Sequence, residues 1–585
     1  MTKRFFESFL PSRKTFAVQL VGLVALALVL VLFLYLVFDR YTASNIPFMN
    51  DSAFSFAVSD LLLDGHQILL GPPSHIGGRH LGPVYYWVVS FSLWVTHGNE
   101  YDAILVLLWL MLLACALTVL MASKLALPGT RLAAAAGTLL CLCGEVYLMQ
   151  IREPWHGNFL FLPSACVLLS FLFALRSGPR YLPIYLLSAS FLMTTHYGCA
   201  PLIAGTSLTL AAYWLALKHR GELPLQRVTR SFLFFGIGVP LCITLLLWLP
   251  LLIFELHYPS NLSALSEAFL KPHHQRAGLG VAITTLLGFL VHHLFITLHT
   301  PRIDEMLNIR PWCAVIGLST IATGLLVGYL RHAPRLMQVF FAGSLVSVLL
   351  FICAASRAPS TPPPYPPIYE YYFNGLLPLP ALFMGMVFSH ALTLIKGNFH
   401  TLCSWPPNLM RGAASAGALL FLPCFTLFAI PGVRHLSFFN SVGPAYSYHT
   451  LRQAKCVSSY IKGDLPENGR ASITTDSESL WMKNSYLYFL GRDYYGDMDA
   501  YGAASPKLYD YFEELSSLAT QPSALNEPIT YVVTCPYVRK IRAGTMFKLR
   551  HQGFTEAYDI SIKDSDACGS CKITRLRRDK ATELQ

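Results

Sequence analysis

The sequence predicts an α-helical membrane protein with about eleven spanning helices, further interfacial helices and a small α/β extracytoplasmic domain at the C-terminal end. Of the 585 residues, 54% are hydrophobic and 13% are charged, whereas an average soluble domain has roughly 25% charged residues. Aromatic residues make up 13% of the chain, as expected for aromatic belts at the membrane interfaces. Only 15 of the 32 acidic residues precede residue 446. A long apolar body is therefore followed by a tail of soluble composition.

The first apolar segment sets the expected orientation of the chain. Lys3, Arg4, Arg13 and Lys14 precede an uninterrupted apolar run, Val18–Phe38. This run has about the 20 residues needed to span a bilayer, and it is longer than the apolar core of a cleavable signal. We therefore expect residues 1–17 to be a cytoplasmic N-terminus and the run to be an uncleaved anchor.

Further candidate spans follow the anchor, and the basic residues between them support one topology. The spans lie near residues 101–125, 132–150, 159–175, 181–195, 199–217, 231–254, 312–330, 337–355, 373–395 and 412–430. Five connections carry positive charge and are expected to face the cytoplasm: Lys124 with Arg131, Arg176 with Arg180, Lys218 to Arg230, Arg331 with Arg335, and Lys396 with Arg411. The net charge of +11 thus reflects these loops and not a nucleic-acid-binding surface.

Two apolar stretches do not fit as spans in this topology. Gly82–Val95 is short and follows a segment rich in Gly and Pro, and Val281–Leu298 contains paired histidines. We expect both to lie at the external surface, although the other connections keep their sides if both cross. The predicted organisation is a membrane domain over residues 18–430, with residues 39–100 as its first external loop, and an extracytoplasmic domain over residues 431–585.

The tail reads as a small α/β domain. Strands are expected at residues 471–475, 529–535 and 557–563, and helices near residues 449–463 and 505–520. Its cysteines are Cys456, Cys535, Cys568 and Cys571, which in an oxidising compartment can form two disulfides with three possible pairings. The last two have the spacing of a redox motif, but without a βαβ context a structural bridge is favoured.

Acidic residues beside apolar segments are costly and often functional. Four stand out in the body: Asp51, Glu145, Glu153 and Glu370. Asp51 begins a short amphipathic stretch, where its simplest role is a helix N-cap. Glu145 precedes Arg152 by one to two helical turns, so an internal ion pair is its favoured role.

The segment that follows Asp51 favours a functional role for this residue. Residues 70–87 form a loop rich in Gly and Pro that ends in Gly82-Pro83-Val84-Tyr85-Tyr86-Trp87. Glycine lets the backbone approach a ligand closely. Arg79 and His80, which lie within this loop, are natural partners for a phosphate.

The order of these features resembles the GT-C glycosyltransferases. More narrowly, it resembles the protein O-mannosyltransferase and aminoarabinose–lipid A transferase group, in particular bacterial members that use polyprenyl-phosphate sugars. The external hairpin 152–158 and the segment 369–373 also correspond to motifs of that group. The likeness covers residues 18–220 well and the tail hardly at all. Ser52 follows Asp51 where several relatives have an acidic pair, and His80 with Leu81 replaces the acid and Lys of aminoarabinose transferases.

The resemblance implies an inverting transfer of a sugar from a polyprenyl-phosphate donor to a glycolipid, polysaccharide or protein of the cell envelope, at the outer face of the inner (plasma) membrane. Asp51 is the expected general base, and Glu153 is a second carboxylate that could position the acceptor, substitute as base or simply pair with Arg152. The expected donor-phosphate ligands are Arg79, His80, Arg152 and Arg276, with Lys271 and Arg357 behind them. The expected sugar or acceptor ligands are Tyr85, Tyr86, Trp155, His156, Asn158, Glu370 and Tyr371, although the aromatic members could instead form an interfacial belt.

No metal or other cofactor is predicted, and a divalent metal is left open. The histidine pairs His273-His274 and His292-His293 lack the spacing of a metal site and are expected in polar packing. The rival function is a transporter or flippase of a lipid-linked saccharide. Against it, the sequence has no internal repeat and no matching pair of broken helices. A third candidate function is a lipid-linked polymerase or ligase, in which the chemistry would lie in a late external loop.

Overall fold

The computed structural model describes most of the helical body and parts of the tail. The described residues are 13–38, 46–72, 79–222, 232–294, 330–402, 451–492, 529–534, 554–560 and 571–578, apart from gaps at 47, 49, 128, 259–260, 271–275, 331–332, 359–369, 466–470 and 476–482. The expected helix at 505–520 and almost all of the expected spans at 312–330 and 412–430 lie outside these residues. So do Lys271, Cys535 and Cys568, and the side chains of Glu145, Glu370 and Tyr371.

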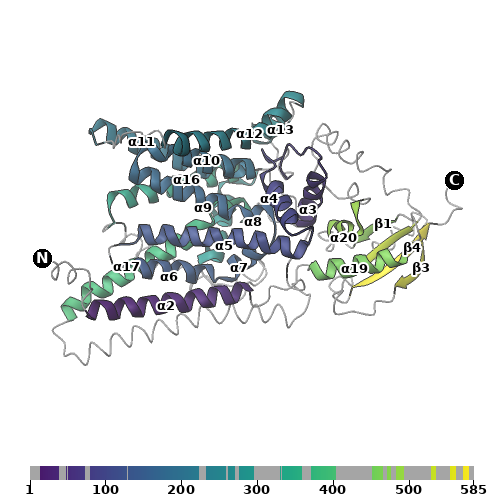
Figure 1. Ribbon diagram of the computed structural model, residues 1–585, viewed down its shortest axis with the longest axis horizontal. Helices are drawn as coiled ribbons and strands as arrows, with labels where there is room; N and C mark the ends of the chain where they lie inside the picture. The colour runs from purple at the N-terminus through teal and green to yellow at the C-terminus, as the bar shows by residue number, and fades with distance from the viewer. Residues whose placement is uncertain are drawn as a thin grey trace.

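The body is a bundle of helices that lie side by side along the long dimension of the molecule (Figure 1). Its long helices are α2 (Arg13–Phe38), α5 (Glu100–Leu125), α9 (Phe161–Ser177), α10 (Leu182–Thr195), α11 (Ala200–His219), α12 (Val239–His257), α16 (Arg335–Arg357) and α17 (Pro378–Leu402). Five helical stretches among the described residues are long and apolar enough to cross a membrane: Glu100–Leu125, His156–Ser177, Tyr197–His219, Phe232–His257 and Arg335–Arg357. The polytopic α-helical fold is therefore confirmed.

One expected span is broken in the structure. The segment 132–150 forms α6 (Arg131–Leu142) and α7 (Glu145–Arg152), which are separated by a turn at Cys143 and Gly144. Cys143 donates its amide to carbonyls near the end of α6, so the backbone bonds of α6 are closed before α7 begins. The break depends on the local turn at Cys143 and Gly144, which the search for apolar runs does not detect.

The two apolar stretches that were not assigned as spans are helices α4 (Val84–Val95) and α14 (Gly278–Leu294). Helix α4 packs against α3 (Asn50–Leu63) at the end of the bundle that carries the first loop (Figure 1). With 12 and 17 residues, both are shorter than the roughly 20 residues of a typical span.

Small residues let the helices of the body approach closely. A Cβ on Gly205 of α11 would lie 2.5 Å from the backbone nitrogen of Ser347 on α16. A Cβ on Gly385 of α17 would lie 2.8 Å from the carbonyl oxygen of Ala134 on α6. Such small-residue contacts replace the hydrophobic driving force, which is weak between helices in lipid.

The described part of the tail contains a four-stranded sheet with the order β1-β2-β4-β3. Strands β1 (Ser472–Thr475) and β2 (Ile529–Thr534) are parallel, whereas β4 (Lys572–Arg578) pairs antiparallel with both β2 and β3 (Phe554–Ile560). Strands β1 and β2 confirm the predicted positions. The third strand begins three residues earlier than expected, and β4 was not predicted. Cys456 and Cys571 are both disulfide-bonded.

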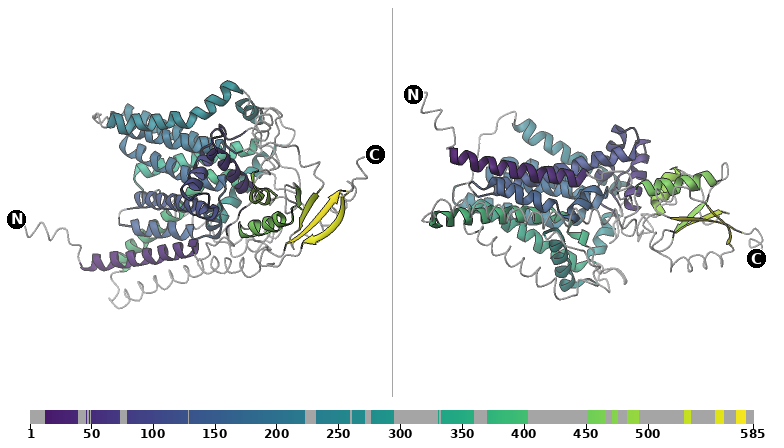
Figure 2. Two further views of the ribbon diagram at one scale, coloured as in Figure 1. Left: turned by 45° about the vertical axis from the view of Figure 1, so that its right-hand side comes forward. Right: turned by 90° about the horizontal axis from the view of Figure 1, so that it is seen from below.

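The sheet domain docks on the first loop of the body through its two helices, α19 (Leu451–Asp464) and α20 (Lys483–Leu490) (Figure 2). The amide of Leu451 donates to the carbonyl of Ile46 at 3.0 Å. Ser485 Oγ donates to the carbonyl of Phe48 at 2.7 Å, and the Phe48 ring packs against Tyr488. Ile46 and Phe48, just before α3, are thus held between the two parts of the molecule.

Candidate functional site

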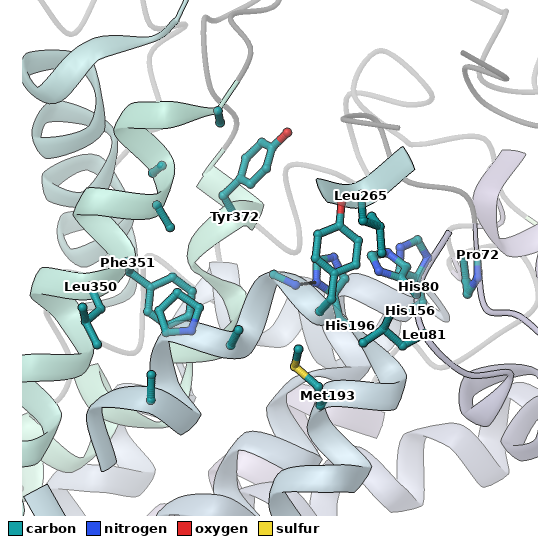
Figure 3. A pocket seen from close by; sticks show the side chains of 18 of the residues that line it. Pro72, His80, Leu81, His156, Met193, His196, Leu265, Leu350, Phe351 and Tyr372 are labelled. Carbon is teal, nitrogen blue, oxygen red and sulfur yellow. Dashed lines mark hydrogen bonds between the residues drawn. The ribbon is translucent and has the colours of Figure 1, made fainter. Parts of the chain in front are cut away.

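A cavity of about 540 Å³ lies where α3, the first loop, the α10–α11 turn and α16 meet. Apolar side chains of its wall include Met193, Leu265, Leu350 and Phe351. In Figure 3, Leu350 and Phe351 lie on the opposite side of the view from the histidines, whereas Met193 and Leu265 lie beside the histidines. The polar and charged members of the described lining are Asp51, Ser55, His80, Trp155, His156, His196, Tyr197, Ser266 and Tyr372.

The first loop is closed on itself just before it reaches the cavity. The amide of Gly71 donates to the carbonyl of His80, and the amide of His80 donates to the carbonyl of Pro72, both at 3.0 Å. A Cβ on Gly71 would lie 2.6 Å from the carbonyl oxygen of Gly82, so only glycine fits this crossing. The closure brings His80 to the cavity wall.

An asparagine from another helix holds the same loop. Asn261, the first residue of α13 (Asn261–Leu270), accepts the amide of Arg79 at 2.7 Å and donates to the carbonyl of Arg79 at 3.2 Å. The Arg79 guanidinium is buried and donates to the carbonyl of Gly71 at 3.3 Å. Sequence reasoning missed Asn261, which carries no motif of its own and lies 182 residues from its partner.

The second hairpin is anchored to helices on either side. Tyr85 Oη donates to the carbonyl of Pro154 at 2.7 Å, and the Arg152 guanidinium donates to the carbonyl of Val37 near the end of α2 at 3.2 Å. Asn374 Nδ2 donates to the carbonyl of Gly157 at 3.1 Å. These bonds hold the hairpin against three separate segments of the chain.

The two expected carboxylates have different surroundings. Asp51 lies in the first turn of α3 and lines the cavity. Glu153 lies behind the wall, in a much smaller cavity that Arg152 and Tyr85 also line. Asn158 Nδ2 donates to Glu153 Oε2 at 2.9 Å. The pKa of Glu153 is raised to about 7, chiefly by burial and to a smaller extent by the negative charge of Asp51, while the bond from Asn158 lowers it.

The remaining predicted ligands divide between the cavity and its surroundings. Trp155 and His156 line the cavity. Tyr85 and Tyr86 are buried on α4 and are not part of the described lining. Tyr372, the residue after Tyr371, lines the cavity.

Two predicted cations lie at the α16 side of the cavity. Arg276 and Arg357 are both exposed. Their chain neighbours are joined, because the amide of Ala277 donates to the carbonyl of Ala358 at 3.2 Å, and Ala358 lines the cavity. The structure thus brings these two arginines to one edge of the site, far along the chain from the Arg79 loop.

Three histidines from three separate connections meet at the polar part of the cavity. His80 comes from the first loop, His156 begins α8 (His156–Phe159), and His196 lies in the turn between α10 and α11. One ring nitrogen from each lies within 4.8 Å of the others. His196 was not predicted, and no motif linked it to the other two.

His293, from one of the histidine pairs considered above, lies elsewhere. It is buried on α14, and its ring nitrogens contact the carbonyl of Phe289 at 2.6 Å and Gln150 Oε1 at 3.1 Å. This is the polar packing that was expected for that pair. The other three residues of the two pairs have no described side chains.

The molecule has the fold of ArnT, a member of the group that its sequence resembles. No protein-family profile and no curated protein sequence matches the chain.

Two solved structures carry the likeness. One is ArnT from Cupriavidus metallidurans bound to undecaprenyl phosphate, with a TM-score of 0.55 and 13% identity over 95% of this chain and 98% of that chain. The other is the same protein in the apo state, with a TM-score of 0.54 and 14% identity over 97% of this chain and 99% of that chain. At this identity the likeness establishes the fold.

Proposed function

We propose that this protein transfers a sugar from a polyprenyl-phosphate donor to a glycolipid, polysaccharide or protein of the cell envelope. The observation that carries the proposal is a single cavity lined by apolar side chains and by Asp51 and histidines. This cavity lies in a fold shared with ArnT, one structure of which is bound to undecaprenyl phosphate. In this proposal the chain is a multi-pass inner-membrane protein with a cytoplasmic N-terminus, and its C-terminal domain and site face outward.

The apolar and the polar side chains of the cavity wall suit the two parts of such a donor. Apolar side chains on α10 and α16, among them Met193, Leu350 and Phe351, can pack against isoprene units. A phosphate requires cations or hydrogen-bond donors, and His80, which lies opposite Leu350 and Phe351 in Figure 3, supplies a donor. Arg276 and Arg357 at the edge add positive charge that attracts an anionic lipid headgroup.

We assign Asp51 as the general base. Its carboxylate removes the proton from an acceptor hydroxyl while that oxygen forms a bond to the anomeric carbon. The bond from the anomeric carbon to the donor phosphate breaks, and polyprenyl phosphate leaves with the bonding electron pair. A single displacement of this kind inverts the anomeric configuration.

Asp51 suits this role better than Glu153 does. Asp51 opens onto the cavity, whereas Glu153 lines the smaller cavity behind it. We assign Glu153 a positioning role, in which its bond with Asn158 shapes the hairpin that carries Trp155 and His156.

The direct test compares Asp51→Asn with Asp60→Asn in reconstituted membranes that contain a labelled polyprenyl-phosphate sugar and an extract of candidate acceptors. Asp60 lies on the same helix and is not part of the described lining, so it is a matched control. Asp51→Asn is expected to lower the transfer rate by about 10²–10⁴-fold, and Asp60→Asn to leave it near wild type.

Full turnover by Asp51→Asn would refute the base assignment. No transfer by the wild type, together with movement of the labelled donor between leaflets, would refute the enzyme and support the transporter.

A further inference from the structure

We propose that His80, His156 and His196 form a binding site for a divalent transition-metal ion of the Zn²⁺ class. No sequence motif connects these residues, which belong to three connections that are up to 116 positions apart. In the structure, one ring nitrogen of each lies within 4.8 Å of the others. The site goes beyond the proposed transfer reaction, since metal binding needs neither donor nor acceptor.

The distances are close to those of a metal site. Zinc–nitrogen bonds of about 2.0–2.1 Å in tetrahedral geometry separate the ligand nitrogens by about 3.4 Å. The three nitrogens must therefore draw together by about 1 Å or slightly more, which side-chain rotation can supply. The His80 and His196 ring centroids are 3.9 Å apart with planes tilted by 34°, so one of these rings must turn to point its lone pair at the ion.

Hydrogen bonds hold the backbone around the three histidines in place, so the adjustment is confined to their side chains. His80 is held by the two-bond closure of the first loop, and His156 begins a helix that the hairpin bonds anchor. The His196 ring accepts the amide of Gly198 at Nδ1 at 3.1 Å. An unprotonated Nδ1 belongs to the neutral imidazole, which is the form that binds metals. An ion bound to Nδ1 of His196 replaces the hydrogen bond from the amide of Gly198.

The cluster is largely shielded from solvent. His80 is 2% exposed and His156 is 9% exposed. Three neutral imidazoles supply three protein ligands, the number found in catalytic zinc sites, where a fourth position stays open. All three rings line the cavity, so that position faces the space in which a ligand oxygen could bind.

Asp51 lines the same cavity and adds a negative charge to the environment of the ion. Imidazole ligands suit Zn²⁺, Cu²⁺ and Ni²⁺ better than Mg²⁺ or Ca²⁺, which prefer oxygen. The proposal therefore specifies a Zn²⁺-class ion and excludes an alkaline-earth ion at this site.

The test measures metal binding by the full chain, purified in detergent with an affinity tag that contains no histidine. After treatment with a chelator, the protein is loaded with Zn²⁺, and bound metal is measured by mass spectrometry. Co²⁺ then serves as a spectroscopic probe of the coordination. We expect one equivalent of bound Zn²⁺ that competes with Co²⁺, and a Co²⁺ absorption spectrum of tetrahedral type.

The variants are His196→Gln, His196→Cys and, as a control, His257→Gln. His257 is exposed at the end of α12. His196→Gln should weaken Zn²⁺ binding by at least about 100-fold, the upper end of what loss of an outer-shell partner costs. His196→Cys should retain binding, and its thiolate should shift the Co²⁺ spectrum. Thermal unfolding without metal shows whether each variant is folded.

Absence of bound Zn²⁺ in the folded wild type would overturn the proposal. Binding that is equally strong in folded His196→Gln and in the control would overturn it too, because the ion would then lie elsewhere. Neither result depends on sugar transfer, so failure of the metal site is distinguishable from failure of the proposed function.

Discussion

Replacing Glu153 with glutamine tests how the burial of this carboxylate affects the stability of the protein. Glu153 lines a small cavity beside the large one and accepts a hydrogen bond from Asn158. Burial is the largest cause that raises its pKa from an ordinary 4.5 to about 7. Glutamine keeps the size and the acceptor oxygen but removes the charge, so the change isolates the cost of burying a carboxylate.

The direction of the pH dependence follows from proton binding. Because the folded pKa is higher, the folded state binds the proton more tightly than the unfolded state between pH 4.5 and about 7. The stabilisation is full below pH 4.5 and is lost as the pH rises to about 7. At 1.36 kcal/mol per pKa unit, the difference is about 3 kcal/mol.

The assay is unfolding of the wild type, Glu153→Gln and Glu222→Gln in detergent at pH 5 and pH 8. Glu222 is exposed and is the matched control. At pH 8, Glu153→Gln should be more stable than the wild type by up to about 3 kcal/mol, and the gap should shrink at pH 5. If Glu153→Gln is less stable than the wild type at pH 8, or the gap does not change with pH, the reasoning is refuted.

Three further substitutions test individual contacts around the site and between the body and the tail. Asn261→Ala removes both bonds to the Arg79 backbone and should cost about 2–4 kcal/mol of stability; unchanged thermal unfolding would contradict this clamp. Gly82→Ala places a Cβ within 2.9 Å of a side chain on α10 and should lower transfer, with normal transfer the contrary result. Lys455→Ala breaks a 2.7 Å pair with Glu100 that is partly exposed and should cost at most about 1 kcal/mol, less at high salt; a larger or salt-independent loss would contradict it.

Much of the fold could be predicted from apolar runs and positive charge. The expected span at 101–125 corresponds to α5, and that at 337–355 corresponds to α16, because an apolar segment of spanning length has few alternatives to a helix in lipid. The break at Gly144 could not be predicted in the same way. It depends on a local turn, which a search for apolar runs of spanning length does not detect.

Only those residues of the site that belong to local sequence motifs could be predicted. Asp51 and His80 were singled out from the acid and the Gly-rich loop, and both line the cavity. Arg152 was expected at the donor phosphate, but its described bond goes to the carbonyl of Val37. Which partner a buried arginine reaches depends on how the helices pack, and a single sequence does not contain that information.

His196 and Asn261 were missed for the same reason, since each acts through contacts that are distant along the chain. One signal was present for His196. The predicted topology puts the turn between residues 195 and 199 on the same side of the membrane as the first loop and the 151–158 hairpin. That placement puts His196 among the external histidines, but it does not separate His80, His156 and His196 from the others on that side.

The central claim is that the cavity binds a polyprenyl-phosphate donor, and photo-crosslinking tests it most directly. A polyprenyl phosphate with a photoreactive group in its first isoprene units would be crosslinked to the full protein in membranes and mapped by peptide mass spectrometry. The account predicts labelling of residues 193–204 and 350–358, which contribute the α10–α11 and α16 parts of the wall, and competition by unlabelled polyprenyl phosphate. Labelling confined to outward-facing positions such as Leu245 and Leu349, which are exposed, would contradict it.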